Sequence, residues 1–239
     1  NCFVPDPSGF PAPHEPRRPH IFTEEQVVRL LKETSKAKVR STAPLHAEGL
    51  RLAIVLLYTT GLRRGELVRL TVSDYDPVDK TLFVRVSKFY KPRLIALSND
   101  AAHEIDVYLQ ARRRLPCPSD APLLVCRSRG LRARSGTGIG LSLHRLFRRA
   151  EVHTADGRFP RVHDLRHTYA VHVLLRWYRA GVDVQAKLPA LSASMGHVSI
   201  VSTAYYLSLL DPFTEAANTR FAQHCRPILD NLLRNEAPR

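Results

Sequence analysis

Four short groups of residues in this chain carry side chains suited to phosphoryl transfer. They are residues 61–63, Lys88, residues 163–167, and residues 196–197 followed by Tyr206. Cleavage of a phosphodiester needs positive charge beside the non-bridging oxygens, an activated nucleophile and a proton for the leaving oxygen. Each group alone is a weak signal. Together their arginines, histidines, lysine and tyrosine would suit the breakage of a nucleic-acid backbone.

Two arginines are suited to holding phosphate oxygens. The guanidinium group stays charged and can donate two parallel hydrogen bonds to a phosphate. Arg63 and Arg166 could each bind a phosphate in this way. Arg63 follows Gly61, where one helix should end and another begin, and we expect this junction to expose its side chain. Taken as an isolated pair, Arg63 and Arg64 would more simply be solvated surface charges.

The sequence His-Asp-Leu-Arg-His occupies residues 163–167. His163 and Arg166 are three residues apart, so on a helix both side chains would share one face near its N-terminus, an end that attracts phosphate. His163 could exchange a proton near neutral pH. We expect His167 to point elsewhere on the helix as a structural, hydrogen-bonding histidine. Because a His-x-x-Arg pair is common, a purely structural role for the whole group is an equal alternative.

Two adjacent tyrosines, Tyr205 and Tyr206, follow the pair Gly196-His197 on a predicted helix. A phenol is a poor nucleophile until a base removes its proton or cations stabilise the phenolate. Neighbouring helical residues diverge by about 100°, so both cannot face one site and one should fill the core. The simpler alternative is that both tyrosines fill the core.

The elements that would position these groups are mostly helical. Thr23 with Gln26 resembles a capping box, a helix from about 46 to 60 should end at Gly61, and a short helix should follow near 65–70. Alternating residues at 81–86 and 93–97 predict a β-hairpin. Further helices are predicted at about 99–114, 141–150, 164–179, 185–194, 199–209 and 212–234. The fold class is therefore mainly α with a small antiparallel β-sheet (α+β).

Composition divides the chain into three parts. Residues 1–20 contain six prolines and predict an extended linker. Residues 21–211 carry all the groups described above and form the predicted catalytic domain, within which residues 126–140, rich in Arg, Ser and Gly, predict a mobile basic loop. Residues 212–239 predict a C-terminal helix and tail.

The charge balance predicts a polyanionic partner. Lys and Arg number 36 against 22 Asp and Glu, a net charge of +14. A nucleic acid is favoured over an anionic membrane, because the basic residues are spread through the chain instead of gathering in one helix or tail. No apolar run has membrane-spanning length, and we expect neither a leader nor a membrane anchor but a soluble cytoplasmic protein. The four cysteines lack zinc spacing, which predicts free thiols and no metal site.

The groups occur in a recognisable order. Several motifs together resemble the catalytic domain of the tyrosine recombinase (phage integrase) family: Thr-Gly-Leu-Arg followed by Glu-Leu within residues 60–67, a hairpin lysine, the residues 163–167, Gly196-His197 and Tyr206. The likeness covers about residue 22 to about residue 225. It implies the fold of that domain and strand cleavage through a 3′-phosphotyrosine, with rejoining to another 5′-hydroxyl. It also implies that neither ATP, a metal nor any other cofactor is used.

The resemblance assigns a role to each residue. Arg63 and Arg166 would hold the scissile phosphate, His163 would handle the proton of the tyrosine, and His197 would donate a hydrogen bond to a phosphate oxygen. Tyr206 would be the nucleophile, which leaves Tyr205 to packing. The general acid would be Lys88 in the hairpin turn, with Lys91 as the alternative.

The resemblance also implies partners. We expect double-stranded DNA, bound by a homo-oligomer, in the family a tetramer, in the bacterial cytoplasm or nucleoid, and a mobile element as the origin. Candidate DNA-backbone contacts are the arginines within 112–114, 127–134, 145–149 and 158–161. We expect the helical core-binding domain that usually precedes this one in the family to be absent, and the C-terminal helix to dock on a neighbouring subunit or on its own core. The alternatives are a type IB topoisomerase and a non-catalytic DNA-binding regulator.

Overall fold

The computed structural model describes residues 17–37, 43, 45–85, 92–113, 120–125, 134–197 and 199–210. Lys88, Lys91 and the four cysteines lie outside these ranges, as does the predicted C-terminal helix. The helices are α1 (Glu24–Ser35), α2 (His46–Thr60), α3 (Arg64–Leu67), α4 (Asn99–Arg112), α5 (Gly136–Arg149), α6 (Asp164–Arg179), α7 (Val184–Met195) and α8 (Val201–Ala204). The described residues also include the 3₁₀ helices η2 (Val72–Asp74) and η3 (Tyr205–Leu209).

A small sheet accompanies the helices, which confirms the predicted fold class. Strands β1 (Tyr75–Asp76), β2 (Thr81–Val84) and β3 (Arg93–Ala96) form an antiparallel sheet in that order. The predicted hairpin is β2 and β3, with Thr81 opposite Ala96 and Val84 opposite Arg93. Strand β1 was not predicted, because two residues are too few to show the alternation that marks a strand.

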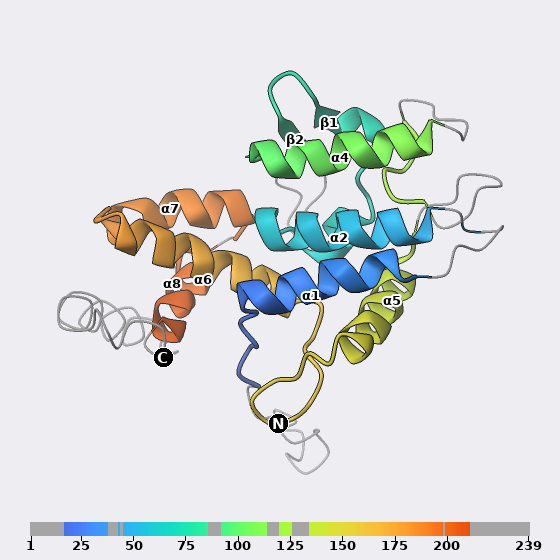
Figure 1. Cartoon of the computed structure of the whole chain (residues 1–239). Helices are drawn as coiled ribbons and strands as arrows, with labels where there is room; N and C mark the ends of the chain where they lie inside the picture. Colours follow the sequence, from blue (N-terminus) through green and yellow to red (C-terminus); the bar gives the residue numbers. More distant parts are fainter. Residues whose placement is uncertain are drawn as a thin grey trace, which may run out of the picture.

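Helix α2 lies at the centre of the fold, between α1 and α4 (Figure 1). Its residues 52–57 are all buried, as expected for a helix covered on every side. It ends at Gly61, which has the left-handed φ of 64°. A Cβ on Gly61 would lie 2.4 Å from the ring of Tyr169, so this end of α2 is closed tightly against α6. The predicted helix and its stop are both confirmed.

The entry to α1 is also as predicted. The Thr23 hydroxyl accepts a hydrogen bond from the Gln26 backbone, and the Gln26 side chain accepts one from the Thr23 backbone. This reciprocal pair satisfies two N–H groups that a helix start leaves without partners.

Helix α5 begins five residues before the predicted position, so the expectation of a mobile loop is wrong for residues 136–140. The Ser135 hydroxyl caps the helix by accepting from Gly138, and Ile139 is fully buried. Gly140 lies against the Arg64 side chain: a Cβ on Gly140 would stand 2.9 Å from Nη1 of Arg64. Glycines that suggest a loop in the sequence therefore serve here as a close-packing surface.

Two apolar clusters meet along α6. The first contains α1, α2, α4, α5 and Leu165 near the start of α6. The second joins the rest of α6 to α7 and η3, and includes Tyr206. Residues 166 and 167 lie at the junction of these clusters, so both clusters fix their positions.

The described ranges give no support for a membrane-spanning helix or for a metal site. No helix there is both long and apolar enough to cross a bilayer. The same residues contain no group of three or more His, Cys, Asp or Glu side chains able to hold a metal ion.

Candidate active site

Five of the six predicted site residues lie within the described ranges, and the structure brings them together. Arg63 precedes α3, and Tyr206 lies in η3. His163 immediately precedes α6, Arg166 lies in the first turn of that helix, and His197 follows α7. The sixth, Lys88, lies outside the described residues with its alternative Lys91.

Arg166 holds two helix ends together. It is only 1% exposed, and its guanidinium donates to the carbonyl oxygens of Gly61 and Met195, the latter at 2.7 Å. These carbonyls lie at the C-termini of α2 and α7, where partial negative charge accumulates. Burial, and then the charge of Arg63, lower the pKa of Arg166 to about 10. The side chain therefore stays positive at neutral pH, inside the protein.

Arg63 is drawn inward as well. Its side chain is 21% exposed and donates at 2.9 Å both to the Glu66 carboxylate and to the Gly196 carbonyl. The prediction that the helix junction exposes Arg63 is wrong, because Glu66 and Gly196 lie on the inner side of that junction. Arg64 is the exposed member of the pair.

Sequence reasoning gave no role in the site to Glu66 and Arg93, which support Arg63. The Glu66 carboxylate accepts from Arg93 at 3.1 and 2.9 Å, and Arg93 also donates to the Ser194 carbonyl at 2.7 Å. Burial alone would raise the pKa of Glu66, but Arg93 and the hydrogen bonds of Arg63 hold it below the usual value. The signal was a Glu three residues after Arg63, since Glu66 also accepts from the Arg63 backbone as in a capping box.

The cluster carries an excess of positive charge. Arg63, Arg93 and Arg166 face one carboxylate, Glu66, so three positive charges less one negative charge leave +2. Uncompensated buried charge is costly unless a partner neutralises it. The arrangement therefore favours an anion at this place.

Tyr206 lies against the same cluster. It is 2% exposed, and its hydroxyl lies 3.1 Å from Nδ1 of His167. Burial raises the pKa of the phenol, although the charge of Arg166 opposes the shift. The phenol is thus protonated at neutral pH. Tyr205, which we expected to pack in the core, is 46% exposed instead.

Two histidines, His167 and His197, contact Tyr206, and a third, His163, contacts His167. The rings of His163 and His167 meet at right angles with centroids 4.7 Å apart, and His197 stacks on Tyr206 at 6.2 Å. Nδ1 of His197 lies 2.7 Å from the Thr203 hydroxyl. The expectation that His167 points elsewhere is wrong: residues four apart on a helix are neighbours, and η3 brings Tyr206 to that side.

The histidines predict a loss of stability in acid. Burial first, then nearby arginines, lower the pKa of His167 and of His197 to about 4, below the ordinary value of 6.5. Below pH 6.5 both imidazoles take up a proton when the chain unfolds, which favours the unfolded state. The free energy of unfolding therefore has its full contribution from these histidines above about pH 6.5 and loses it as the pH falls towards 4. Urea unfolding between pH 7.5 and 4.5 should show this decline, with a shallower slope for His167→Phe. Equal slopes in the two proteins would contradict it.

Some basic residues are unavailable to an outside partner. Arg112 is fully buried and donates to the carbonyls of Pro122 and Leu123, while Arg134 is 6% exposed and donates to Val125. The expectation that these two contact a DNA backbone is therefore wrong. Arg145, Arg148 and Arg149 on α5 are exposed and keep that possibility.

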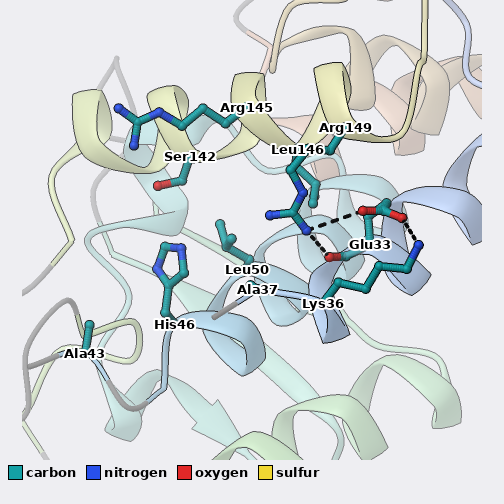
Figure 2. A pocket seen from close by; sticks show the side chains of 10 residues that line it. All are labelled: Glu33, Lys36, Ala37, Ala43, His46, Leu50, Ser142, Arg145, Leu146 and Arg149. Carbon is teal, nitrogen blue, oxygen red and sulfur yellow. Dashed lines mark hydrogen bonds and ion pairs between the residues drawn. The ribbon is translucent and has the colours of Figure 1, made fainter. Parts of the chain in front are cut away.

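A separate basic pocket of about 530 Å³ lies between α1, α2 and α5. Figure 2 shows Glu33 between Lys36 and Arg149, with His46 and Arg145 across the opening. His46 starts α2, whereas Gly61 ends it. At a rise of 1.5 Å per residue the pocket is about 20 Å from the arginine cluster, so it is not part of the candidate site.

Comparisons with known proteins agree with this geometry. Residues 20–211 match the phage integrase family. The putative integrase/recombinase y4rE of Sinorhizobium fredii is 34% identical, covering 84% of this chain and 63% of the relative. The tyrosine recombinase XerA of Pyrococcus furiosus is 29% identical, covering 91% of this chain and 65% of the relative. The chain thus spans somewhat less than two thirds of the length of these relatives.

Solved structures share the fold. A crystal structure of XerA recombinase gives a TM-score of 0.61 at 23% identity, covering 96% of this chain and 68% of that one. The Tn1549 transposon integrase in complex with a circular intermediate DNA gives 0.60 at 22% identity, covering 80% and 62%. At such identities these structures show the fold alone. The match over residues 20–211 places this chain in the phage integrase family.

Proposed function

We propose that this chain is the catalytic part of a site-specific DNA recombinase or integrase from a mobile element, which cuts and rejoins strands through a tyrosine. One observation carries the proposal: the Tyr206 phenol is buried against an arginine cluster with an excess charge of +2. A scissile phosphate would supply the missing negative charge. The relatives that carry the names integrase and tyrosine recombinase support this function.

The proposed reaction uses the residues as follows. Arg63, Arg166 and His197 bind the non-bridging oxygens, while the Tyr206 oxygen attacks phosphorus and the bond to the 5′-oxygen breaks. An imidazole beside Tyr206 takes the phenolic proton, the role that the resemblance gives to His163. Lys88, or else Lys91, gives a proton to the 5′-oxygen. The covalent bond keeps the energy for rejoining, and arginines supply the positive charge that Mg²⁺ provides in other phosphoryl transfers.

A covalent-trapping experiment tests this function. The probe is a pool of duplexes with a randomised centre and a nick close to the cleavage position. After cleavage, the short fragment that carries the released 5′-hydroxyl diffuses away, so rejoining cannot occur. We expect the protein to form a DNA adduct that resists denaturation, and Tyr206→Phe to form none because phenylalanine has no nucleophilic oxygen. Tyr205→Phe is the control and should keep the adduct, since Tyr205 is exposed. No adduct with the unaltered protein, or an adduct with Tyr206→Phe, would overturn the function.

The partner and assembly are also proposals. We infer that the DNA is double-stranded and that four copies act together in the cytoplasm or nucleoid. XerH bound to palindromic difH substrate and a lambda integrase dimer bound to a core site are solved neighbours, which supports a DNA partner read by more than one copy. We keep residues 21–211 as the catalytic domain, 1–20 as a linker and 212–239 as a segment that docks on a neighbouring copy or on its own core.

A further inference from the structure

We propose that Thr203 is a positioning residue: its hydroxyl holds the His197 ring so that the Nε2–H of that ring is directed at the scissile phosphate. This assignment rests on the proposed function and deepens it, because it names the group that orients one of the phosphate ligands. Thr203 would act through His197 and would not itself touch the DNA.

The contact between Thr203 and His197 is short and lies in the protein interior. Nδ1 of His197 is 2.7 Å from the Thr203 hydroxyl oxygen. Thr203 is 0% exposed, whereas His197 is half-buried. Water therefore does not compete for this hydroxyl, and a hydrogen bond in such surroundings is stronger than one in water.

The burial of Thr203 also decides which atom donates the hydrogen bond. Within the described part of the chain, the Thr203 hydroxyl has Nδ1 of His197 as its one partner. A buried hydroxyl whose proton met no acceptor would cost free energy, so the proton must point at Nδ1. Nδ1 then accepts, and the neutral ring carries its own proton on Nε2. That N–H is the donor a phosphate oxygen needs.

The His197 ring is neutral before DNA binds, as this direction of the hydrogen bond requires. Burial first, and then Arg166 and other cations, lower its pKa to about 4. The groups that face the ring come from several elements: Arg63 before α3, Arg93 on β3, His163 before α6, Arg166 and His167 on α6, and Tyr206 on η3. At neutral pH one ring nitrogen therefore accepts and the other donates.

The backbone and the ring of His197 are held by different elements. Its N–H donates to the Ser192 carbonyl at 3.0 Å, at the end of α7. Its ring stacks on the Tyr206 ring, with an interplanar angle of 14° and centroids 6.2 Å apart. A half turn about the Cβ–Cγ bond would keep this stacking but exchange the nitrogen and carbon positions. The hydrogen bond from Thr203 to Nδ1 excludes that turn, so it sets which edge of the ring faces the site.

One short segment therefore positions both the phenol and the imidazole. Thr203 ends three residues before Tyr206, and α8 continues directly into η3. Residues three apart lie on the same side of a helix, so the hydroxyl and the phenol ring reach His197 together. When Tyr206 is in its place, Thr203 is in place as well, and Nε2 of His197 is directed at the phosphate.

Two substitutions separate the Thr203 hydroxyl from the volume of the side chain. Thr203→Val keeps the shape and lacks the hydroxyl, whereas Thr203→Ser keeps the hydroxyl. In single-turnover adduct formation on the randomised nicked duplexes, we expect Thr203→Val to be about tenfold slower, the effect of one lost hydrogen bond. Thr203→Ser should stay within about threefold of the unaltered protein.

The control for these changes is Thr34→Val. Thr34 is also buried, at 1% exposed, but its hydroxyl donates to the Leu31 carbonyl in α1. We expect this variant to form the adduct at the rate of the unaltered protein, because α1 carries none of the site residues.

A double-mutant cycle tests whether Thr203 acts through His197. His197→Phe keeps a ring that can stack on Tyr206 but has no nitrogen. In the His197→Phe background, Thr203→Val should change the adduct rate by less than about twofold, because the group that it orients is gone. The same loss of about tenfold in both backgrounds would show that Thr203 serves only the fold, and would overturn the proposal.

A second measurement needs no DNA. In protein labelled with ¹⁵N-histidine, we expect the His197 ring at pH 7 to carry its proton on Nε2; His197→Phe identifies the signals. A proton on Nδ1 would overturn the proposal, even if Thr203→Val failed to fold. So would a Thr203→Ser variant as slow as Thr203→Val. No adduct with the unaltered protein would instead overturn the proposed function, and this assignment with it.

Discussion

Arg166→Lys is expected to lower the rate of strand cleavage about 100- to 1,000-fold, as the loss of a charge-stabilising donor does in other enzymes. The Arg166 guanidinium spans the carbonyls of Gly61 and Met195 while presenting its charge beside Tyr206. A lysine ammonium is a single point that cannot reach both carbonyls and a phosphate together. Burial among arginines would also lower its pKa and favour the neutral amine.

The same change should lower the free energy of unfolding. At least one buried carbonyl would lose its partner, which costs about 1–3 kcal/mol. Single-turnover adduct formation and urea unfolding measure the two effects. Arg51→Lys is the control, because Arg51 is 44% exposed in its pair with Glu104. Near-normal cleavage by Arg166→Lys would contradict a role for Arg166 in holding phosphate.

Glu66→Gln is expected to destabilise the protein by about 3–5 kcal/mol, because it leaves buried charges without their partner. The carboxylate accepts from Arg93 twice, and from both the side chain and the backbone of Arg63. A neutral amide provides one acceptor oxygen and brings N–H donors towards the guanidiniums. Arg63 would lose its orientation, so cleavage should fall together with stability.

The control for this change is Glu104→Gln. Glu104 also receives two hydrogen bonds from one arginine, Arg51, but at the surface, where such pairs contribute about 0–1 kcal/mol. Urea unfolding of both variants at pH 7.5 compares the buried and the exposed pair directly. Equal losses in the two would show that Glu66 does not anchor the arginine cluster.

Local signals predicted much of the fold. The capping box at Thr23, the stop at Gly61 and the hairpin of β2 and β3 each depend on neighbouring residues, and all are confirmed. The start of α5 was misplaced because glycines usually mark loops, whereas here Gly140 makes room for Arg64. The predicted single helix at 199–209 is instead α8 followed by the 3₁₀ helix η3, and nothing in the structure explains this change of helix type.

The sequence named five residues that the structure brings together, but it did not predict their contacts. The spacing of residues 163–167 predicted that His163 and Arg166 share a helix face. It could not predict that the Arg166 guanidinium donates hydrogen bonds to the backbone carbonyls of Gly61 and Met195. The contact between His167 and Tyr206 joins residues 39 apart in the sequence. Such contacts depend on how the two apolar clusters pack along α6, which periodicity does not encode.

One structure would test most directly whether these side chains converge on one phosphate. The sample is the protein with a cleaved duplex and orthovanadate, which takes the place of the phosphorus during transfer. We expect vanadium bonded to the Tyr206 oxygen, with the guanidiniums of Arg63 and Arg166 about 3 Å from its equatorial oxygens. Vanadium bonded to Tyr205, or both guanidiniums turned away from it, would contradict the proposed site.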